Sequence, residues 1–181
     1  MIPELSIEEL TSEAEKAYKD KLYIQAANSY AQIAVIYDAR SELVLAAEMR
    51  NNQSVALLLA NNAQAALKAA LDTDVIFAEA KKLTKLAIAL SNQAAALEAL
   101  GKDYEALSKY QDAAKLLRST GEIKMLSIVL KQISIIQLRN RRPLESLASM
   151  NSALNASQPD NAKEKSLKKL LSILFKKEDK D

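Results

Sequence analysis

The 181-residue chain contains no cysteine, histidine or tryptophan, and these absences exclude whole classes of chemistry. Without cysteine there are no disulfides and no thiol nucleophiles, and without histidine there is no imidazole base. Zinc sites built from Cys or His ligands are excluded for the same reason. The sequence therefore predicts neither a metal site nor a cofactor.

Glycine and proline are also scarce, with two and three residues respectively. A sheet made of many β-hairpins needs more turn residues than this chain offers. The residues that dominate instead, chiefly Ala, Leu, Lys, Glu and Gln, have high helix propensity. The composition predicts an all-α protein.

Long apolar runs and strong net charge are missing as well. No uncharged run is long enough to span a bilayer, and the acidic start of the chain does not resemble a secretory signal, so we expect a cytoplasmic protein without stable membrane insertion. A net charge of +2 without an aromatic-rich basic stretch argues against nucleic-acid binding. The acid pairs Asp72 with Asp74 and Asp103 with Glu105 fall at predicted turns, where carboxylates cap helices, so we expect no enzyme.

One stretch, residues 90–117, shows how the chain is built. Leu90, Ala94 and Leu97 share one helix face, because their spacings are four and three. Gly101 then allows the chain to leave the helix, and a second apolar row starts at Ala106. Two short amphipathic helices joined in this way form a hairpin, which cannot cover its own apolar faces.

The hairpin recurs at intervals of about forty residues, and small residues return at fixed places in each copy. The second helix of each copy has a small residue at Ala26, Ala66, Ala106 and Ser146, and the first helix has one at Ala14, Ser54, Ala94 and Ser134. Helices approach closely only where neither side chain blocks them, so these positions predict tight helix packing within a stack of hairpins.

The third copy resembles the tetratricopeptide repeat (TPR) family. Its residues Ala94, Gly101, Ala106, Tyr110 and Ala113 match the family pattern in order and spacing. The period is longer than the usual 34 residues, as in the variant repeats of kinesin light chains. The resemblance implies a right-handed superhelical solenoid of about four TPR-like hairpins with a capping helix at its C-terminal end. A HEAT or armadillo-type array is the alternative.

Residues typical of turns mark the boundaries between the predicted hairpins. The predicted hairpins cover residues 6–40, 41–73, 74–119 and 120–158. Residues 160–181 are predicted as a basic amphipathic capping helix, with Asp160 as its N-cap and an end near Lys177, followed by a charged tail. Ser6 with Glu9, and Ser119 with Glu122, have the spacing of a capping box. The run from Val75 to Leu100 predicts one long helix.

The function expected from this fold is protein recognition. First helices line the concave side of such a stack, and side-chain amides there suit the N–H and C=O groups of an extended peptide. The predicted partner-binding groove consists of Asn51, Asn52, Val55, Ser91, Asn92, Ala95, Lys131, Gln132, Ile135 and Arg139. The alternative is a structural module that forms a homo-oligomer or docks through its basic last helix.

Overall fold

The computed structural model describes residues 6–157 and 161–176, and every regular element within these ranges is an α-helix. The all-α prediction is confirmed. In chain order the helices are α1 (Ile7–Lys19), α2 (Tyr23–Ala39), α3 (Leu43–Leu59), α4 (Ala63–Ala70), α5 (Thr73–Glu79), α6 (Leu83–Ala99), α7 (Asp103–Ser119), α8 (Ile123–Arg139), α9 (Pro143–Ala156) and α10 (Ala162–Lys176).

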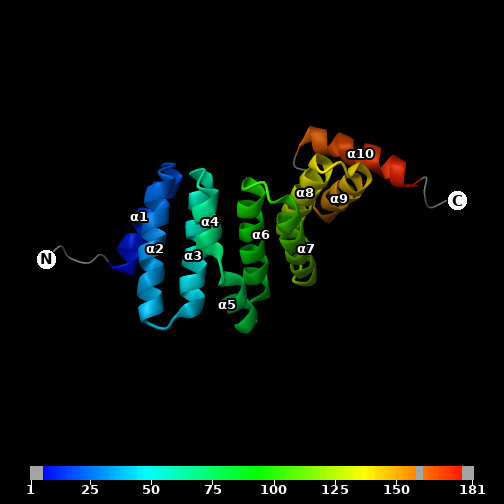
Figure 1. Ribbon diagram of the computed structural model, residues 1–181. Coiled ribbons are helices and arrows are strands. Elements are labelled where there is room, and N and C mark those ends of the chain that lie inside the picture. The colour runs from blue at the N-terminus through cyan, green and yellow to red at the C-terminus, as the bar shows by residue number, and fades with distance from the viewer. Residues whose placement is uncertain (1–5, 158–160, 177–181) are drawn as a thin grey trace. The chain divides into compact units, whose positions relative to one another are not determined.

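The chain divides into two compact units, Met1–Lys109 and Tyr110–Asp181, and the boundary falls within α7. In the first unit α1 packs on α2, α2 on α3, and α3 on α4, α5 and α6. Figure 1 shows α2, α3, α4 and α6 standing side by side, with α5 continuing from α4. In the second unit α8 packs on α9, and α9 also contacts α10.

The turns between helices recur every twenty residues with one backbone geometry. At the first turn the Lys21 N–H donates to the Tyr18 carbonyl (3.1 Å), and the Leu22 N–H donates to the Ala17 carbonyl (2.8 Å). This pair of bonds is a Schellman motif, which requires a left-handed residue just past the helix end. In the turns that follow this twenty-residue spacing, the left-handed residues are Lys21, Ser41, Asn61, Lys81, Gly101, Gly121 and Arg141.

This regularity explains the forty-residue period of the sequence. Helices α2, α3, α6, α7 and α8 are each 17 residues long, and three-residue turns join them. One period is therefore two segments of helix plus turn. Helices α4 and α5 together occupy the place of one such helix, residues 63–79, which is interrupted at Leu71 and Asp72.

The small residues of both helix columns are buried, as predicted. Ala26, Ala66 and Ala106 are fully buried and Ser146 is nearly so, and Ala14, Ser54, Ala94 and Ser134 are buried in the first helices. Where serine replaces alanine, it also joins the two helices of its hairpin: the Ser54 hydroxyl donates to the Ala66 carbonyl at 2.8 Å. In the fourth hairpin the Ser134 hydroxyl donates to the Ser146 carbonyl at 2.9 Å.

Larger side chains fill the space between these close contacts. In the first unit Ala17, Ala26, Ala27 and Ala56 form one buried cluster, and Tyr30 packs against it. Burial raises the pKa of the Tyr30 hydroxyl above its ordinary value, with a smaller contribution from the negative charge of Glu15. Tyr30 thus fills the space that the small side chains of this cluster leave.

Three local predictions had different outcomes. The capping box of Ser6 and Glu9 is present at the start of α1. The second capping box is wrong, because α7 continues through Ser119, whose hydroxyl donates to the Leu116 carbonyl of its own last turn. The predicted N-cap Asp160 lies outside the described residues, and the Asn161 side chain accepts from the Glu164 N–H at 2.9 Å at the start of α10.

The single long helix predicted from Val75 to Leu100 is wrong. Helix α5 ends at Glu79 and α6 begins at Leu83. The turn between them contains Lys81 in the left-handed conformation, at φ 55°, where no glycine, asparagine or proline announces a break.

Candidate functional site

The predicted groove residues lie on α3, α6 and α8, which are the first helices of their hairpins. Helices α3 and α6 pack on each other in the first unit, so this pair of helices carries one group of the predicted residues. That group is Asn51, Asn52, Val55, Ser91, Asn92 and Ala95. The second unit carries Lys131, Gln132, Ile135 and Arg139 on α8.

In the first unit, neighbouring polar residues have different environments. Asn52 is exposed and Asn92 is half-buried, so both side chains reach the surface. Asn51 is buried, and its side-chain oxygen lies 3.2 Å from the Thr73 hydroxyl, within the interior of the unit. The Ser91 hydroxyl donates to the Ala87 carbonyl of its own helix at 2.8 Å. The accessible amides of this unit are therefore Asn52 and Asn92.

In the second unit the predicted residues are two cations, one amide and one aliphatic side chain, and the amide, Gln132, is half-buried. Lys131 is half-buried, and its ammonium lies 2.8 Å from a carboxylate oxygen of Glu164 on α10. Ile135 is 47% exposed, and Arg139 is exposed at the last residue of α8. Apart from Gln132, the predicted residues of α8 are thus charged or aliphatic, whereas those of α3 and α6 are all uncharged.

A cavity of about 660 Å³ lies along the first half of α8. Its lining residues are Ile123, Lys124, Ser127, Ile128, Lys131, Ala156 and Ser157. The Ser157 hydroxyl donates to the Ser127 oxygen at 2.9 Å, and the Ser127 hydroxyl donates to the Ala153 carbonyl. Sequence reasoning missed Lys124 and Ile128, although counting back seven and three residues from Lys131 finds them on the same helix face.

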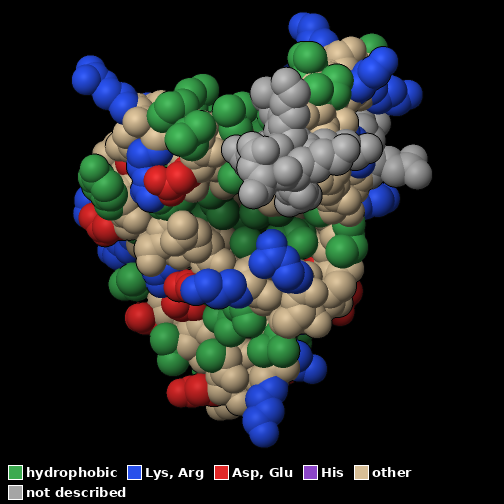
Figure 2. Space-filling model, turned by 90° about the vertical axis from the view of Figure 1, so that its right-hand side faces the viewer, with side chains coloured by type: hydrophobic (Ala, Val, Ile, Leu, Met, Phe, Trp, Pro, Cys, Tyr) green, Lys and Arg blue, Asp and Glu red, His purple; other side chains and the backbone are tan. Residues whose placement is uncertain are grey.

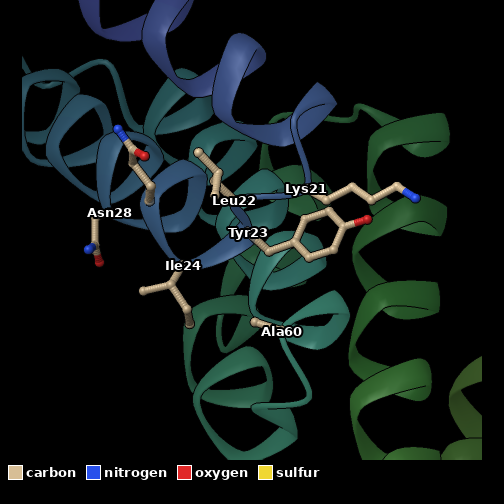
Figure 3. A pocket seen from close by; sticks show the side chains of 7 residues that line it. Lys21, Leu22, Tyr23, Ile24, Asn28 and Ala60 are labelled. Carbon is tan, nitrogen blue, oxygen red and sulfur yellow. The ribbon is translucent and has the colours of Figure 1, made fainter.

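A second cavity, of about 530 Å³, lies at the turn between α1 and α2 (Figure 3). It is lined by Lys21, Leu22, Tyr23, Ile24, Gln25, Asn28 and Ala60. Leu22 and Ile24 are more than half exposed, and the Tyr23 ring meets the Tyr18 ring edge-on with centroids 5.7 Å apart. No sequence pattern indicates a role for this turn.

A polar cluster surrounds the interruption between α4 and α5. Gln93 donates both to the Ala70 carbonyl and to the Asp74 carboxylate, each at 2.9 Å, and the Lys109 ammonium lies 3.2 Å from the other Asp74 oxygen. Burial alone raises the pKa of Asp74, but the hydrogen bond from Gln93 and the positive charge of Lys109 outweigh it and hold that pKa below its ordinary value. Asp74 is thus ionised at neutral pH, and its role is to hold Gln93 and Lys109 in place.

The described residues offer few other features suited to chemistry. Within residues 6–157 and 161–176, no group of three or more Asp or Glu side chains is placed to hold a metal ion. None of the helices in this part of the chain is long and apolar enough to cross a membrane. On the face shown in Figure 2, Lys and Arg side chains are interspersed with acidic and hydrophobic ones.

The paired helices, their common turns and the small residues between them define a TPR-like repeat fold, and the resemblance noted in the sequence is confirmed for the fold. Such repeats typically serve protein–protein interaction. No family model matches the sequence, and neither does any curated protein.

Among solved structures, the chain is similar to the nearly identical TPR-like repeats of a putative kinesin light chain from Podospora anserina. The TM-score is 0.54 at 16% sequence identity, and the match covers 98% of this chain and 100% of that one. The crystal structure of a variant of the same fungal protein gives a TM-score of 0.54 at 15% identity, with the same coverage. At this identity the similarity concerns the fold.

Proposed function

We propose that the chain is a non-catalytic adaptor that binds a segment of a partner protein on the first helices of its hairpins. The observation that carries this proposal is the recurrence of an accessible amide at one helix position, in Asn52, Asn92 and Gln132. Asn52 is exposed, and Asn92 and Gln132 are half-buried. By contrast, Gln93 and Ile133, which follow the latter two amides in the sequence, are buried. The cytoplasmic location expected from the sequence belongs to the same proposal.

Amide side chains fit this role because each can donate and accept a hydrogen bond at once. A peptide in extended conformation offers alternating N–H and C=O groups, which match such side chains along its length. Val55 and Ala95, three residues after Asn52 and Asn92, supply partly exposed apolar surface beside them. The proposed contact therefore combines backbone recognition with a modest apolar area.

The test uses peptides selected from a random library on the immobilised chain, measured by calorimetry. Replacing both Asn52 and Asn92 by alanine should weaken binding by about tenfold, because each lost hydrogen bond contributes about 0.5–1.5 kcal/mol. The thermal midpoint should hardly change, since both side chains reach solvent. Asn28→Ala is the matched control, because Asn28 is an exposed asparagine on the second helix α2. Unaltered affinity in the double variant would contradict the proposal.

A second candidate function is self-association through α10. Leu171 of this helix is buried, but Leu170 and Ile173 are 60% and 54% exposed, and they lie three residues apart on one face. An exposed aliphatic pair on a basic helix favours contact with another apolar surface. This candidate is the assembly module that the sequence left as the alternative.

Sedimentation equilibrium tests the second candidate. If α10 mediates assembly, Leu170→Glu with Ile173→Glu should shift an oligomer to monomer, because two carboxylates at the contact prevent burial of the pair. Lys169→Glu is the control, since Lys169 is exposed on the same helix. A wild-type chain that remains monomeric at high concentration would refute this candidate.

A further inference from the structure

Helix α8 differs from the other first helices along one face. Counting in steps of forty residues, the face that carries Lys124, Ile128, Lys131 and Ile135 on α8 carries Thr84, Ile88, Ser91 and Ala95 on α6, and Val44, Glu48, Asn51 and Val55 on α3. The packing positions of the repeat keep their size from copy to copy, whereas this face changes in charge. The two lysines are therefore not required by the repeat fold.

The four residues of α8, which we name the α8 stripe, share one helix face because they are spaced by four, three and four residues. Ile128 and Ile135 are 59% and 47% exposed, so the hairpin itself does not bury them. Lys124 and Lys131 stand seven residues apart, about 10 Å along the helix, on either side of Ile128. The stripe thus offers an aliphatic contact between two cations.

The α8 stripe borders the cavity that lies along α8. Its wall includes three residues of the stripe, Lys124, Ile128 and Lys131, and its volume of about 660 Å³ exceeds that of a single large side chain. The Lys131 ammonium already donates to a carboxylate, that of Glu164 on α10, at 2.8 Å. An anionic side chain from outside therefore meets a site whose local chemistry suits carboxylates.

The charge of the two units points in the same direction. The sequence of the second unit has 14 Lys and Arg against 8 Asp and Glu, whereas the first unit has 11 against 15. Their formal net charges are therefore +6 and −4. Complementary charge steers partners together and excludes those of like charge.

We propose that the α8 stripe binds an acidic amphipathic segment of a partner protein. An aliphatic side chain of that segment packs on Ile128 in the cavity, and its carboxylates pair with Lys124 and Lys131. This inference goes beyond the proposed adaptor function, because it concerns a different surface, on α8, and a segment of different chemistry. Partner carboxylates share Lys131 with Glu164 or displace that residue.

The probe is a fluorescently labelled synthetic amphipathic helix with leucine and glutamate on one face, compared with the same helix in which glutamine replaces each of these glutamates. In fluorescence anisotropy the glutamate helix should bind at least about tenfold more tightly than the glutamine helix. Raising the salt concentration should weaken the glutamate helix alone. Equal affinity of the two helices would overturn the proposal.

Charge reversal on the chain locates the contact. Lys124→Glu should weaken the glutamate helix by about tenfold, and Lys124→Gln by less. Lys115→Glu is the matched control: it makes the same change in net charge within the second unit, at a side chain that is 74% exposed and paired with Asp112 on α7. If both charge-reversed variants lose the same affinity for the glutamate helix, binding depends only on the net charge of the unit, and the α8 stripe is not the site.

Two further measurements separate this inference from the proposed function. If the library-selected peptides depend on Asn52 and Asn92 but Lys124→Glu leaves the glutamate helix unaffected, the adaptor function stands and the α8 stripe proposal fails. If sedimentation shows that a second copy of the chain occupies the stripe, with Lys124→Glu abolishing dimers that the glutamate helix cannot displace, the proposed partner class is wrong.

Discussion

Five of the seven turn residues with a left-handed backbone are not glycine, although a side chain makes this conformation costly. A Cβ atom destabilises the left-handed backbone by about 1 kcal/mol, and asparagine tolerates it better than most residues. Lys21, Lys81 and Arg141 therefore hold local strain that Gly101 and Gly121 avoid. The Schellman hydrogen bonds and the packing of the flanking helices offset this cost.

At these turns, a substitution to glycine and a substitution of glycine should change the stability of the fold in opposite directions. Lys81→Gly or Arg141→Gly should raise the thermal midpoint, by an increase in stability of about 0.5–1 kcal/mol, because the folded backbone is relieved of strain. Gly101→Ala should lower stability by about 1 kcal/mol, although an added Cβ would meet no atom within 4 Å, so the cost is purely conformational. Thermal unfolding followed by circular dichroism checks both. A lower midpoint for Lys81→Gly would contradict this account.

Residue type predicts buried small positions well and surface positions poorly. Alanine and serine at fixed intervals identified the packing columns, because only small side chains fit there. Asn51 and Asn52 carry the same side chain, yet one is buried and the other exposed, because neighbouring residues on a helix point about 100° apart. The buried role of Asn51 depends on Thr73, 22 residues away, and no local pattern reveals such a contact.

At the scale of the element, the interruption between α4 and α5 depends on replacing one helical hydrogen bond. In an unbroken helix the Ala70 carbonyl would accept from the backbone N–H four residues later. Here the Thr73 hydroxyl donates to it at 2.8 Å and Gln93 at 2.9 Å, while Leu71 turns outward and is 60% exposed. The buried carbonyl stays satisfied, so the helix can break inside the unit at little cost.

Asp74 should make this element sensitive to acid. Because its pKa is lower in the folded chain than in the unfolded one, where it is about 3.9, its contribution is complete above that value and is lost as the pH falls through the folded pKa. Asp74→Asn should lower stability by about 1 kcal/mol at neutral pH and by less at an acidic pH below the unfolded pKa. Urea unfolding at both pH values measures the difference.

Asp72→Asn is the control for this experiment. Asp72 lies two residues away, is exposed and has a left-handed backbone that asparagine also adopts. It should change stability little at either pH. A loss that is equal for Asp74→Asn at neutral and acidic pH would show that the charge does not matter.

The start of this break was predictable and its continuation was not. Asp72 and Thr73 are typical of a helix end followed by a new start. The next turn consists of Ala80, Lys81 and Lys82, residues that favour helix, so the sequence predicted one long helix there. The regular spacing of the other turns by twenty residues is the signal that would have found it.

At the scale of the whole molecule, a repeat array is held together mainly by contacts between neighbours, so stability is expected to vary along the chain. The described contacts fit this view, because most join helices adjacent in sequence. The stack of hairpins was predictable from the forty-residue period. The division into two units within α7 was not, because the repeat pattern continues through Lys109 and Tyr110 without a turn signal.

Conservative core substitutions in each unit should therefore have local effects. Ile136→Val on α8 should cost about 1 kcal/mol and speed hydrogen exchange in α8 and α9, with little change in α1 and α2. Ile33→Val on α2 is the matched change in the first unit, since both isoleucines are fully buried, and it should give the opposite distribution. Hydrogen exchange read by mass spectrometry tests this pair, and uniform acceleration throughout the described helices would contradict it.

The evenly spaced turns also bear on how the length of such a chain can change. Ser41, Lys81 and Gly121 are forty residues apart and share one backbone conformation, so splicing the chain from one of them to the next removes a whole hairpin and rebuilds the same junction. Splicing over twenty residues would put a second helix in the place of a first, and its close-packing column would then face the wrong neighbour. Whole hairpins can therefore be gained or lost between these equivalent turns in steps of forty residues.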